Sequence, residues 1–225
     1  MSTRERMVEA AFALFEEQGY DATTVEQIVE RAGVSRSTFF RAFGSKDDVI
    51  FPRHDDLRAR IEARLATGTP ATMRVAVVEA ARLVLDQYLE EGALALGRYR
   101  LTRTVPALRD REIASMVGYQ RLFRDRLRDW LPEPAGDLHA ELLAAAVVTA
   151  HNVVLRRWLR GVTAEPGAEF EDAMDAVFAM AGSWTHSDGD APQGAAVVVV
   201  SSDRPASEVA ALVEQALSRP ASRRR

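Results

Sequence analysis

The sequence has no cysteine, and only one of its 29 basic residues, Lys46, is a lysine. Without cysteine the chain cannot form a disulfide, a thiolate zinc site or a cysteine nucleophile. It also lacks an uninterrupted run near the ~18 apolar residues that a transmembrane helix needs. Charges interrupt the N-terminal stretch, where a signal peptide would be apolar. These absences favour a cytoplasmic protein.

The residue patterns of the common enzyme classes are missing as well. The sequence contains no H-E-x-x-H, G-x-S-x-G, P-loop or dinucleotide-binding motif. Its histidines do not have metal-ligand spacing, and three adjacent helical residues such as "HDD" at 54–56 point in different directions. We therefore expect no catalytic residue, metal or cofactor, and an enzyme is the least favoured function. The histidines are His54, His139, His151 and His186.

What the sequence does contain is a large apolar fraction and one short basic segment. Apolar residues make up 47% of the chain, which is ample for a buried core. The net charge of −4 argues against coating nucleic acid with the whole surface, so any contact with DNA must be local. Residues 32–51, "AGVSRSTFFRAFGSKDDVIF", offer such a place. They hold Arg36, Arg41 and Lys46, with no carboxylate between Gly33 and Lys46.

The N-terminal residues have the pattern of two helices joined by a turn to a third. Apolar residues recur at helical spacing in residues 4–18, and Gly19 is typical of a helix end. Gly33 stands where a helix C-terminus needs a left-handed residue, and Ser35 can cap a short helix over 36–43. This spacing predicts a helix-turn-helix. Two capping boxes are open for the middle helix: Thr23 with Glu26, or Thr24 with Gln27.

A fourth helix is predicted over residues 45–66, because Ser45 and Asp48 can cap it. Pro52 would lie inside this helix, where proline removes a backbone hydrogen bond and bends the axis. Two interpretations are open: a hinge that carries ligand-driven motion to the DNA-binding end, or a static kink or helix junction at "FPRHDD".

The remaining sequence is also helical in pattern, so we predict an all-α fold of about nine helices. Residues 93–105 fit either a short helix or a strand, and we favour the helix. We assign residues 1–50 to a helix-turn-helix domain, 51–185 to a second helical domain, and 186–225 to a linker and C-terminal extension of undetermined structure. The other predicted helices cover 71–91, 106–131, 138–160 and 169–184. Val75 is expected on the inner face of the first of these and Ile113 on the inner face of the second.

The run "AAFALFEEQGYDATTVEQIVERAGVSRSTFFRAFGSKDDVI" resembles the TetR/AcrR family of bacterial transcription regulators. The resemblance covers somewhat under a third of the chain. It implies an N-terminal DNA-binding domain, and it implies that the helical domain over residues 51–185 binds a ligand and forms a dimer. The segments "VIFPRHDDLRARI" and "HNVVLRRWLRG" resemble, more weakly, a branch of the family whose ligands are acyl-CoA-like.

A two-turn helix fits the major groove, where hydroxyls and guanidinium groups can read base edges. Phe39 and Phe43 are expected in the core, and Phe40 stands where family members commonly have tyrosine. The alternative is a solvated helix that carries a chance run of charge. The predicted DNA-contacting residues are Thr24 and Lys46 at phosphates, and Ser35, Arg36, Ser37, Thr38, Phe40 and Arg41 in the groove.

Two copies of such a domain read a palindrome, so we expect a homodimer. The last two helices of the bundle are the expected interface, through Ala144, Ala145, Ala146 and Ala150 on one helix and Met174, Val177, Phe178 and Ala181 on the next. The alternative is that these residues are buried within a single subunit.

Polar residues on otherwise apolar helix faces suggest an effector pocket, because ligand pockets combine apolar walls with a few polar groups. For each of them, a hydrogen-bonded core position is the alternative. We predict a repressor released from DNA by a small hydrophobic or acyl-CoA-like effector; a regulator without a small-molecule effector is the second possibility. The predicted lining residues are Leu85, Tyr88, Tyr99, Arg103, Met116, Gln120, Phe123, His151 and Asn152.

Overall fold

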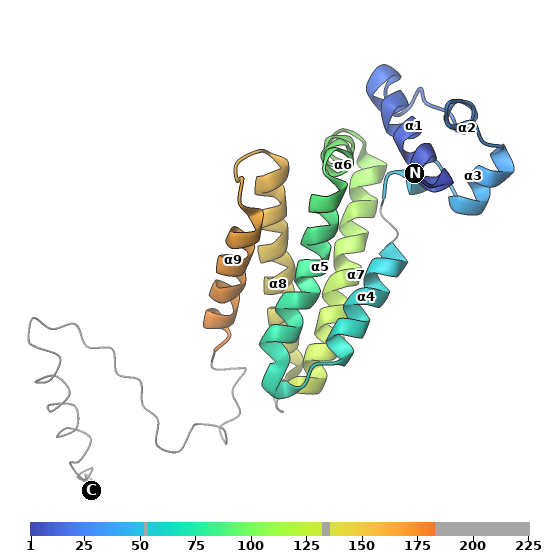
Figure 1. Cartoon of the computed structure of the whole chain (residues 1–225). Helices are drawn as coiled ribbons and strands as arrows, with labels where there is room; N and C mark the ends of the chain where they lie inside the picture. Colours follow the sequence, from blue (N-terminus) through green and yellow to red (C-terminus); the bar gives the residue numbers. More distant parts are fainter. Residues whose placement is uncertain (52–53, 132–135, 183–225) are drawn as a thin grey trace, which may run out of the picture. The chain divides into compact units, whose positions relative to one another are not determined.

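The computed structural model describes residues 1–51, 54–131 and 136–182, and every regular element in these ranges is helical. The all-α prediction is confirmed there (Figure 1). Pro52 and the predicted extension 186–225 lie outside the described residues. The α-helices are α1 (Thr3–Gln18), α2 (Val25–Ala32), α3 (Arg36–Ala42), α4 (His54–Ala66), α5 (Met73–Glu91), α6 (Ala93–Thr104), α7 (Pro106–Trp130), α8 (Gly136–Leu159) and α9 (Pro166–Met180).

Local capping chemistry sets the ends of the first three helices. The Thr24 hydroxyl accepts a hydrogen bond from Gln27 N at 3.3 Å, and Thr24 N donates one to Gln27 Oε1 at 2.9 Å. Gly33 ends α2 with φ +63° and ψ +43°, the left-handed conformation that glycine adopts without strain. Ser35 then caps α3 through Thr38 N at 3.1 Å. The predicted helix-turn-helix is confirmed, and Thr24 rather than Thr23 forms the capping box.

The aromatic and aliphatic side chains of α1, α2 and α3 form one small core. Phe39 and Ile28 are fully buried, and Phe43 is nearly so. Leu108 of α7 belongs to the same cluster, which ties the helix-turn-helix to the bundle. The prediction that Phe39 and Phe43 are core residues is confirmed.

The prediction of a continuous helix over 45–66 is wrong. Ser45 N does donate to Asp48 Oδ2 at 2.8 Å, but the chain makes only a 3₁₀ turn, Asp47–Val49, and α4 begins at His54. The reason is tertiary. Residues 49–51 are all buried in the first core, and three successive side chains cannot share one face of an α-helix.

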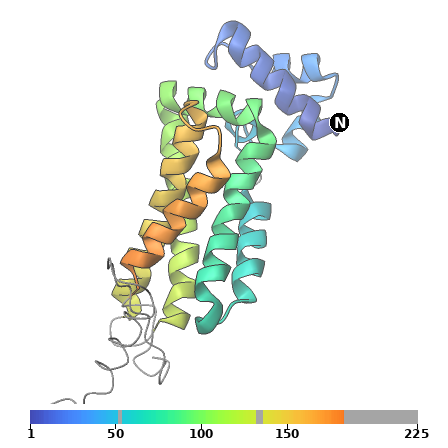
Figure 2. The ribbon, with the colours of Figure 1, turned by 60° about the vertical axis from the view of Figure 1, so that its left-hand side comes forward.

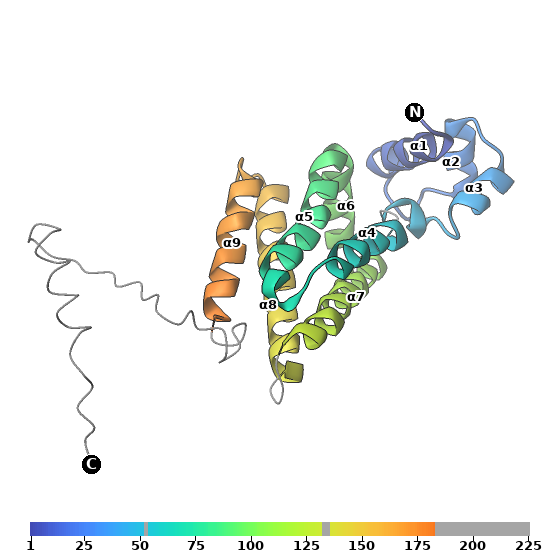
Figure 3. The same ribbon diagram turned by 60° about the horizontal axis from the view of Figure 1, so that its bottom comes forward.

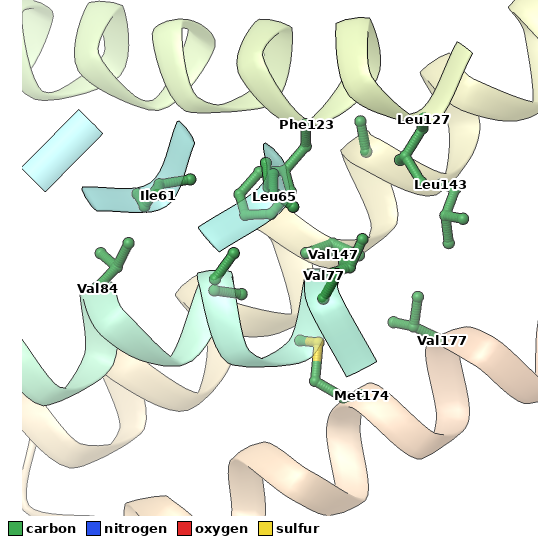
Figure 4. Close-up of a cluster of buried hydrophobic side chains, with 14 of the residues drawn as sticks. Ile61, Leu65, Val77, Val84, Phe123, Leu127, Leu143, Val147, Met174 and Val177 are labelled. Carbon is green, nitrogen blue, oxygen red and sulfur yellow. The ribbon is translucent and has the colours of Figure 1, made fainter. Parts of the chain in front are cut away.

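Helices α4, α5, α7, α8 and α9 enclose a second core, with α6 packed against α5 and α7. Figure 4 shows side chains from these five helices, among them Leu65, Val77, Phe123, Val147 and Met174, directed into a common interior. Turning the molecule shows α9 beside α8 at the edge of the bundle (Figures 2 and 3). Helix α8 is long and apolar enough to cross a membrane by length and composition. Its apolar residues are accounted for in part by its place in this core.

Two residues predicted on inner helix faces are exposed in the structure. Val75 and Ile113, which the sequence pattern places inside, are 53% and 47% exposed. Alanines explain the error on α5, because Ala76, Ala80 and Ala81 are buried and let neighbouring helices approach closely. Because alanine is only weakly hydrophobic, helical periodicity does not reveal that this face of α5 is buried.

Candidate nucleic-acid interface and effector cavity

Helix α3 separates its residues into a buried face and an exposed face. Phe39 and Phe43 point into the core, whereas Arg36, Phe40 and Arg41 are exposed. Ser35 and Ser37 are exposed too, and Ser35 Oγ lies 2.9 Å from both Ser37 Oγ and Thr38 Oγ1. The predicted groove-reading residues therefore share one surface, with Thr38 half-buried at its edge.

The two arginines of α3 differ in how they are held. Arg36 forms an exposed ion pair with Glu26 at 2.6 Å, and its guanidinium lies 5.5 Å from the Phe40 ring. Arg41 makes no ion pair or side-chain hydrogen bond with the described residues. A guanidinium without an ion pair gives up little when it binds DNA, whereas one that is paired must first break its ion pair with a carboxylate. Of the two predicted base contacts, Arg41 is thus the one that would not have to break an ion pair first.

An open groove runs between the start of α1 and helix α3. Ser35, Thr38 and Arg41 line it from one side, and Arg4 and Arg6 line it from the other. The sequence prediction did not include Arg4 and Arg6. They are 30 or more positions from α3 in the chain, and only the packing of α1 on α3 brings them together. Arg4 also lies over the Phe43 ring at 4.6 Å.

Lys46 has a structural role that the sequence did not reveal. Its Nζ donates to Tyr20 O at 2.7 Å and to Thr23 O at 2.9 Å, and it lies 4.0 Å from the Tyr20 ring centre. Tyr20 donates to Asp47, and burial together with this carboxylate raises the Tyr20 pKa above its ordinary value. Lys46 therefore fixes the turn between α1 and α2. Its contact with phosphate stays a prediction, as does that of the exposed cap Thr24.

The bundle contains a cavity of about 360 Å³. Most of the predicted ligand residues line it: Tyr88, Tyr99, Arg103, Met116, Phe123, His151 and Asn152. Two do not. Leu85 is fully buried in the core, and Gln120 donates to Glu141 at 3.0 Å in an exposed contact between α7 and α8. The α7 stripe that faces the cavity runs through Tyr119 instead, one residue from the predicted position.

Several lining residues were missed by the sequence analysis. Four of them surround the predicted set on α7 and α8: Glu112, Ser115, Tyr119 and Arg156. Glu112, Met116 and Tyr119 recur at three- and four-residue spacing, a signal that could have found this face of α7. Phe51 was not findable in this way, because it lies in the irregular segment before α4.

His151 is the buried histidine of the cavity wall. It is 6% exposed, and its Nδ1 lies 3.4 Å from Asn152 Oδ1. Burial lowers its pKa to about 4, and the contact with Asn152 only partly opposes this shift. The imidazole is therefore neutral near neutral pH. Its Nε2 is buried without a hydrogen-bond partner.

The cavity wall is connected to the core of the helix-turn-helix through Arg98. Arg98 is 4% exposed, its Nε donates to Ile50 O at 2.7 Å, and its guanidinium lies 5.1 Å from the ring of the cavity residue Tyr88. It also forms an ion pair with Glu91. The cavity residue Phe51 directly follows Ile50 in the chain. The cavity and the first core are thus joined through a buried charged contact.

Comparison with known proteins agrees with this architecture. A family model described as "Bacterial regulatory proteins, tetR family" matches residues 7–51. The HTH-type transcriptional regulator TcmR of Streptomyces glaucescens is 31% identical over 193 residues, which cover 78% of this chain and 82% of TcmR. The chain belongs to the TetR/AcrR family of transcriptional regulators. Members of this family are DNA-binding regulators rather than enzymes, and they typically act as dimers that respond to small molecules.

One further relative of this TetR-family chain matches a short stretch of it, and two solved structures match most of its fold. HbdR of Aromatoleum sp. (strain CIB), also an HTH-type transcriptional regulator, is 46% identical over 48 residues, or 21% of each chain. A solved TetR-family regulator from Syntrophomonas wolfei aligns with a TM-score of 0.59 at 14% identity, covering 80% of this chain and 95% of its own. A structure of the SmeT–triclosan complex aligns at 0.58 and 19% identity, covering 90% of this chain and 100% of SmeT. These structures share the fold.

Proposed function

We propose that this TetR-family regulator is a cytoplasmic homodimeric repressor that binds a palindromic operator and leaves it when a small effector fills the bundle cavity. The observation that carries the proposal is that Arg98 contacts both the cavity wall and the core of the helix-turn-helix. Its guanidinium lies against the cavity residue Tyr88, and its Nε holds the carbonyl of Ile50 beside the DNA-binding core.

The DNA-reading part of the proposal rests on the exposed face of α3. Arg36 and Arg41 extend from a helix of about two turns, which is the size of element that enters a major groove. Bidentate pairing of one arginine with guanine contributes roughly 1–3 kcal/mol of discrimination between bases. Arg4 and Arg6 supply cations beside this helix, where a phosphate backbone would run.

The dimer is proposed through α8 and α9, but with different residues from those suggested by the sequence. Ala144, Met174 and Ala181 are fully buried within the chain, and Val177 and Phe178 nearly so. An exposed apolar stripe remains on the outer face of these helices. Leu138, Leu142 and Val153 on α8 and Met180 on α9 are 44–62% exposed. A second copy would cover this stripe, because exposed apolar surface of this kind marks an association site.

Release would follow from competition for the same side chains. A ligand that packs against Tyr88 would shift the ring beside which the Arg98 guanidinium lies. A ligand that packs against Phe51 would shift the residue that directly follows Ile50. Two recognition helices must lie ~34–36 Å apart to contact successive major grooves. A small shift of each DNA-binding end therefore changes operator affinity. The hinge at Pro52 stays a prediction outside the described residues.

The presence of a cavity favours an effector over the alternative of a regulator that needs none. A bundle core without a cavity would have supported that alternative, and about 360 Å³ lies within the range of small-molecule sites. Small hydrophobic and acyl-CoA-like compounds are the classes that we propose. The SmeT structure, a protein of the same fold, is a complex with triclosan.

Footprinting of the purified protein on its own upstream DNA, repeated across a ligand panel, tests the proposal. We expect a protected palindrome that loses protection in the presence of at least one compound. Protection without symmetry would contradict the homodimer, and protection that no bound compound changes would favour the regulator without an effector.

A further inference from the structure

The cavity wall contains a polar atom that the protein itself leaves without a partner. His151 is 94% buried, and its Nε2 makes no hydrogen bond. Buried ring nitrogens are normally paired, because leaving one unsatisfied costs free energy comparable to a lost hydrogen bond. Among the described residues that line the cavity, His151 is the one with such an atom. The site is therefore incomplete in the absence of a ligand.

The neighbours of His151 determine which tautomer is present. Asn152 Nδ2 lies 3.1 Å from Met116 Sδ, an acceptor with no proton to give, so the amide NH₂ faces the sulfur. The amide oxygen then faces His151 Nδ1, at 3.4 Å. Because an amide oxygen only accepts, Nδ1 carries the proton of the neutral ring. Nε2 is left with a lone pair, and it needs a donor from the ligand rather than a carbonyl or an ether.

The apolar part of the cavity suits flat rings. Tyr88, Tyr99, Tyr119, Phe51 and Phe123 supply its aromatic surfaces. Such side chains pack favourably with other rings in stacked or edge-to-face geometry. The volume of about 360 Å³ is more than twice the ~150 Å³ of a cavity that binds one benzene ring. Two or three fused rings fit this space.

The exposed part of the lining is strongly cationic. It contains Arg103, Arg109, Arg156 and Arg160, with Glu112 as its one carboxylate among the described residues. Arg109 and Arg160 are partly engaged, since they donate to backbone carbonyls near the ends of α6 and α8. Arg103 donates only to the Tyr99 hydroxyl, and Arg156 contacts only Met116 Sδ, at 3.9 Å. These two guanidinium groups have no anionic partner in the described chain.

We propose that the cavity takes an aromatic hydroxy acid of two or three fused rings. Its hydroxyl donates to His151 Nε2, its rings lie among the tyrosines, and its acid group faces Arg103 and Arg156. The inference rests on the proposed function in one respect, that this compound is the effector. It also narrows that proposal, because a saturated acyl chain offers no donor to the imidazole.

Four probe compounds separate the elements of the proposal in calorimetric titrations of the full-length protein at pH 7.5. 6-Hydroxy-2-naphthoic acid has both groups, 6-methoxy-2-naphthoic acid replaces the donor by an ether, 2-naphthol lacks the acid, and 2-naphthoic acid lacks the hydroxyl. We expect the hydroxy acid to bind roughly tenfold more tightly than each of the others, the change that about one hydrogen bond makes.

Two variants locate the groups. His151→Phe keeps an aromatic ring in place and removes the acceptor, so the hydroxy and methoxy acids should bind equally. Arg103→Gln with Arg156→Gln should remove the advantage of the hydroxy acid over 2-naphthol. Arg128→Gln is the matched control, since Arg128 is exposed, pairs with Asp137 and does not line the cavity. It should leave all four affinities unchanged.

Equal binding of the hydroxy and methoxy acids to the wild-type protein would overturn the inference, and so would the absence of binding by all four probes. These comparisons need no variant, so they decide the matter even if His151→Phe does not fold. Operator binding measured on the same preparation separates the two proposals. If DNA is bound but the hydroxy acid is not, the inference alone fails; if the hydroxy acid binds without releasing DNA, its role as effector fails.

Discussion

At the scale of single residues, His151 links the cavity to the stability of the fold. Its pKa lies at about 4 in the folded chain because burial disfavours the charged ring, against an ordinary value of 6.5. Between about pH 4 and pH 6.5 the imidazole of His151 binds a proton in the unfolded chain but stays neutral in the folded chain. Stability is therefore complete above about pH 6.5 and is lost as the pH falls toward 4.

This shift gives a prediction for urea unfolding. Between pH 7.5 and pH 5, the wild-type protein should lose about 2 kcal/mol more than His151→Phe, from ~1.4 kcal/mol for each pH unit below 6.5. Carboxylates that titrate in the same range are shared by both proteins and cancel in the comparison. Equal losses in the two proteins would show that the folded imidazole titrates normally.

Arg98 is the second residue whose surroundings predict a large effect. Replacing it by methionine removes the cationic partner of Glu91, a side chain that is only 15% exposed and keeps its hydrogen bond from Gln87. It also removes the donor to Ile50 O. Breaking one partner of a buried ion pair costs about 3–5 kcal/mol. We expect Arg98→Met to lower the free energy of unfolding by this order.

The double variant Arg98→Met with Glu91→Leu is the control for that measurement. It removes the Glu91 carboxylate together with the Arg98 guanidinium, so part of the lost free energy of unfolding should be recovered. A single variant within about 1 kcal/mol of wild type would mean that Arg98 is not essential to the joint between cavity and DNA-binding end.

At the scale of helices, the packing of α6 on α1 depends on a glycine. A Cβ at Gly97 would lie 2.8 Å from Phe12 Cδ1, closer than side chains approach, and the Phe12 ring is buried. Crowding of this kind costs about 1–3 kcal/mol, against a helix-propensity gain of up to ~1 kcal/mol. We expect Gly97→Ala to lower the free energy of unfolding.

Gly118 in α7 provides the matched control. The nearest atom to its added Cβ would be Arg58 Nη1 at 3.7 Å, an ordinary contact. Gly118→Ala should therefore stabilise the protein by up to ~1 kcal/mol. Chemical denaturation of both variants checks the pair, and a stabilised Gly97→Ala protein would contradict the close contact between α1 and α6.

Helices could be predicted from the sequence where local chemistry determines them. Gly33 and Ser35 fix a turn and a cap through their own backbone and hydroxyl groups, so their roles were visible in the sequence, whereas Thr24 was one of two possible caps until the structure showed it. The segment after Ser45 was not predictable in this way. Its cap hydrogen bonds form as expected, but burial of three successive residues decides the fold, and that burial depends on α1 and α7.

The same distinction applies to the cavity. Periodicity identified most of its wall, because polar residues on apolar helix faces are visible in the sequence. It placed Gln120 one residue from the true stripe, where Tyr119 lies, because the positions three and four residues after Met116 both lie near its face of the helix. The contributions of Phe51, Arg109, Arg156 and Arg160 needed the arrangement of several helices, which no single segment encodes.

At the scale of the whole molecule, the proposed dimer depends on the exposed stripe of α8 and α9. Leu142→Arg with Val153→Arg places two charges in an interface that would otherwise be apolar. We expect a monomer in light scattering and weak operator binding, because a single half-site gives little affinity. Val75→Arg is the control: it alters an equally exposed apolar residue on α5 and should leave the dimer intact. A dimeric double variant would move the interface elsewhere.

The central claim is that α3 reads DNA through its arginines. Fluorescence anisotropy of a labelled upstream fragment tests it with Arg36→Ala, Arg41→Ala and the control Arg126→Ala, whose exposed partner is Asp129 on the same helix. Each α3 variant should weaken binding by roughly 1–3 kcal/mol, about five- to 150-fold, while the control binds as wild type does. Affinities for the upstream fragment that are equal in all four proteins would contradict the account.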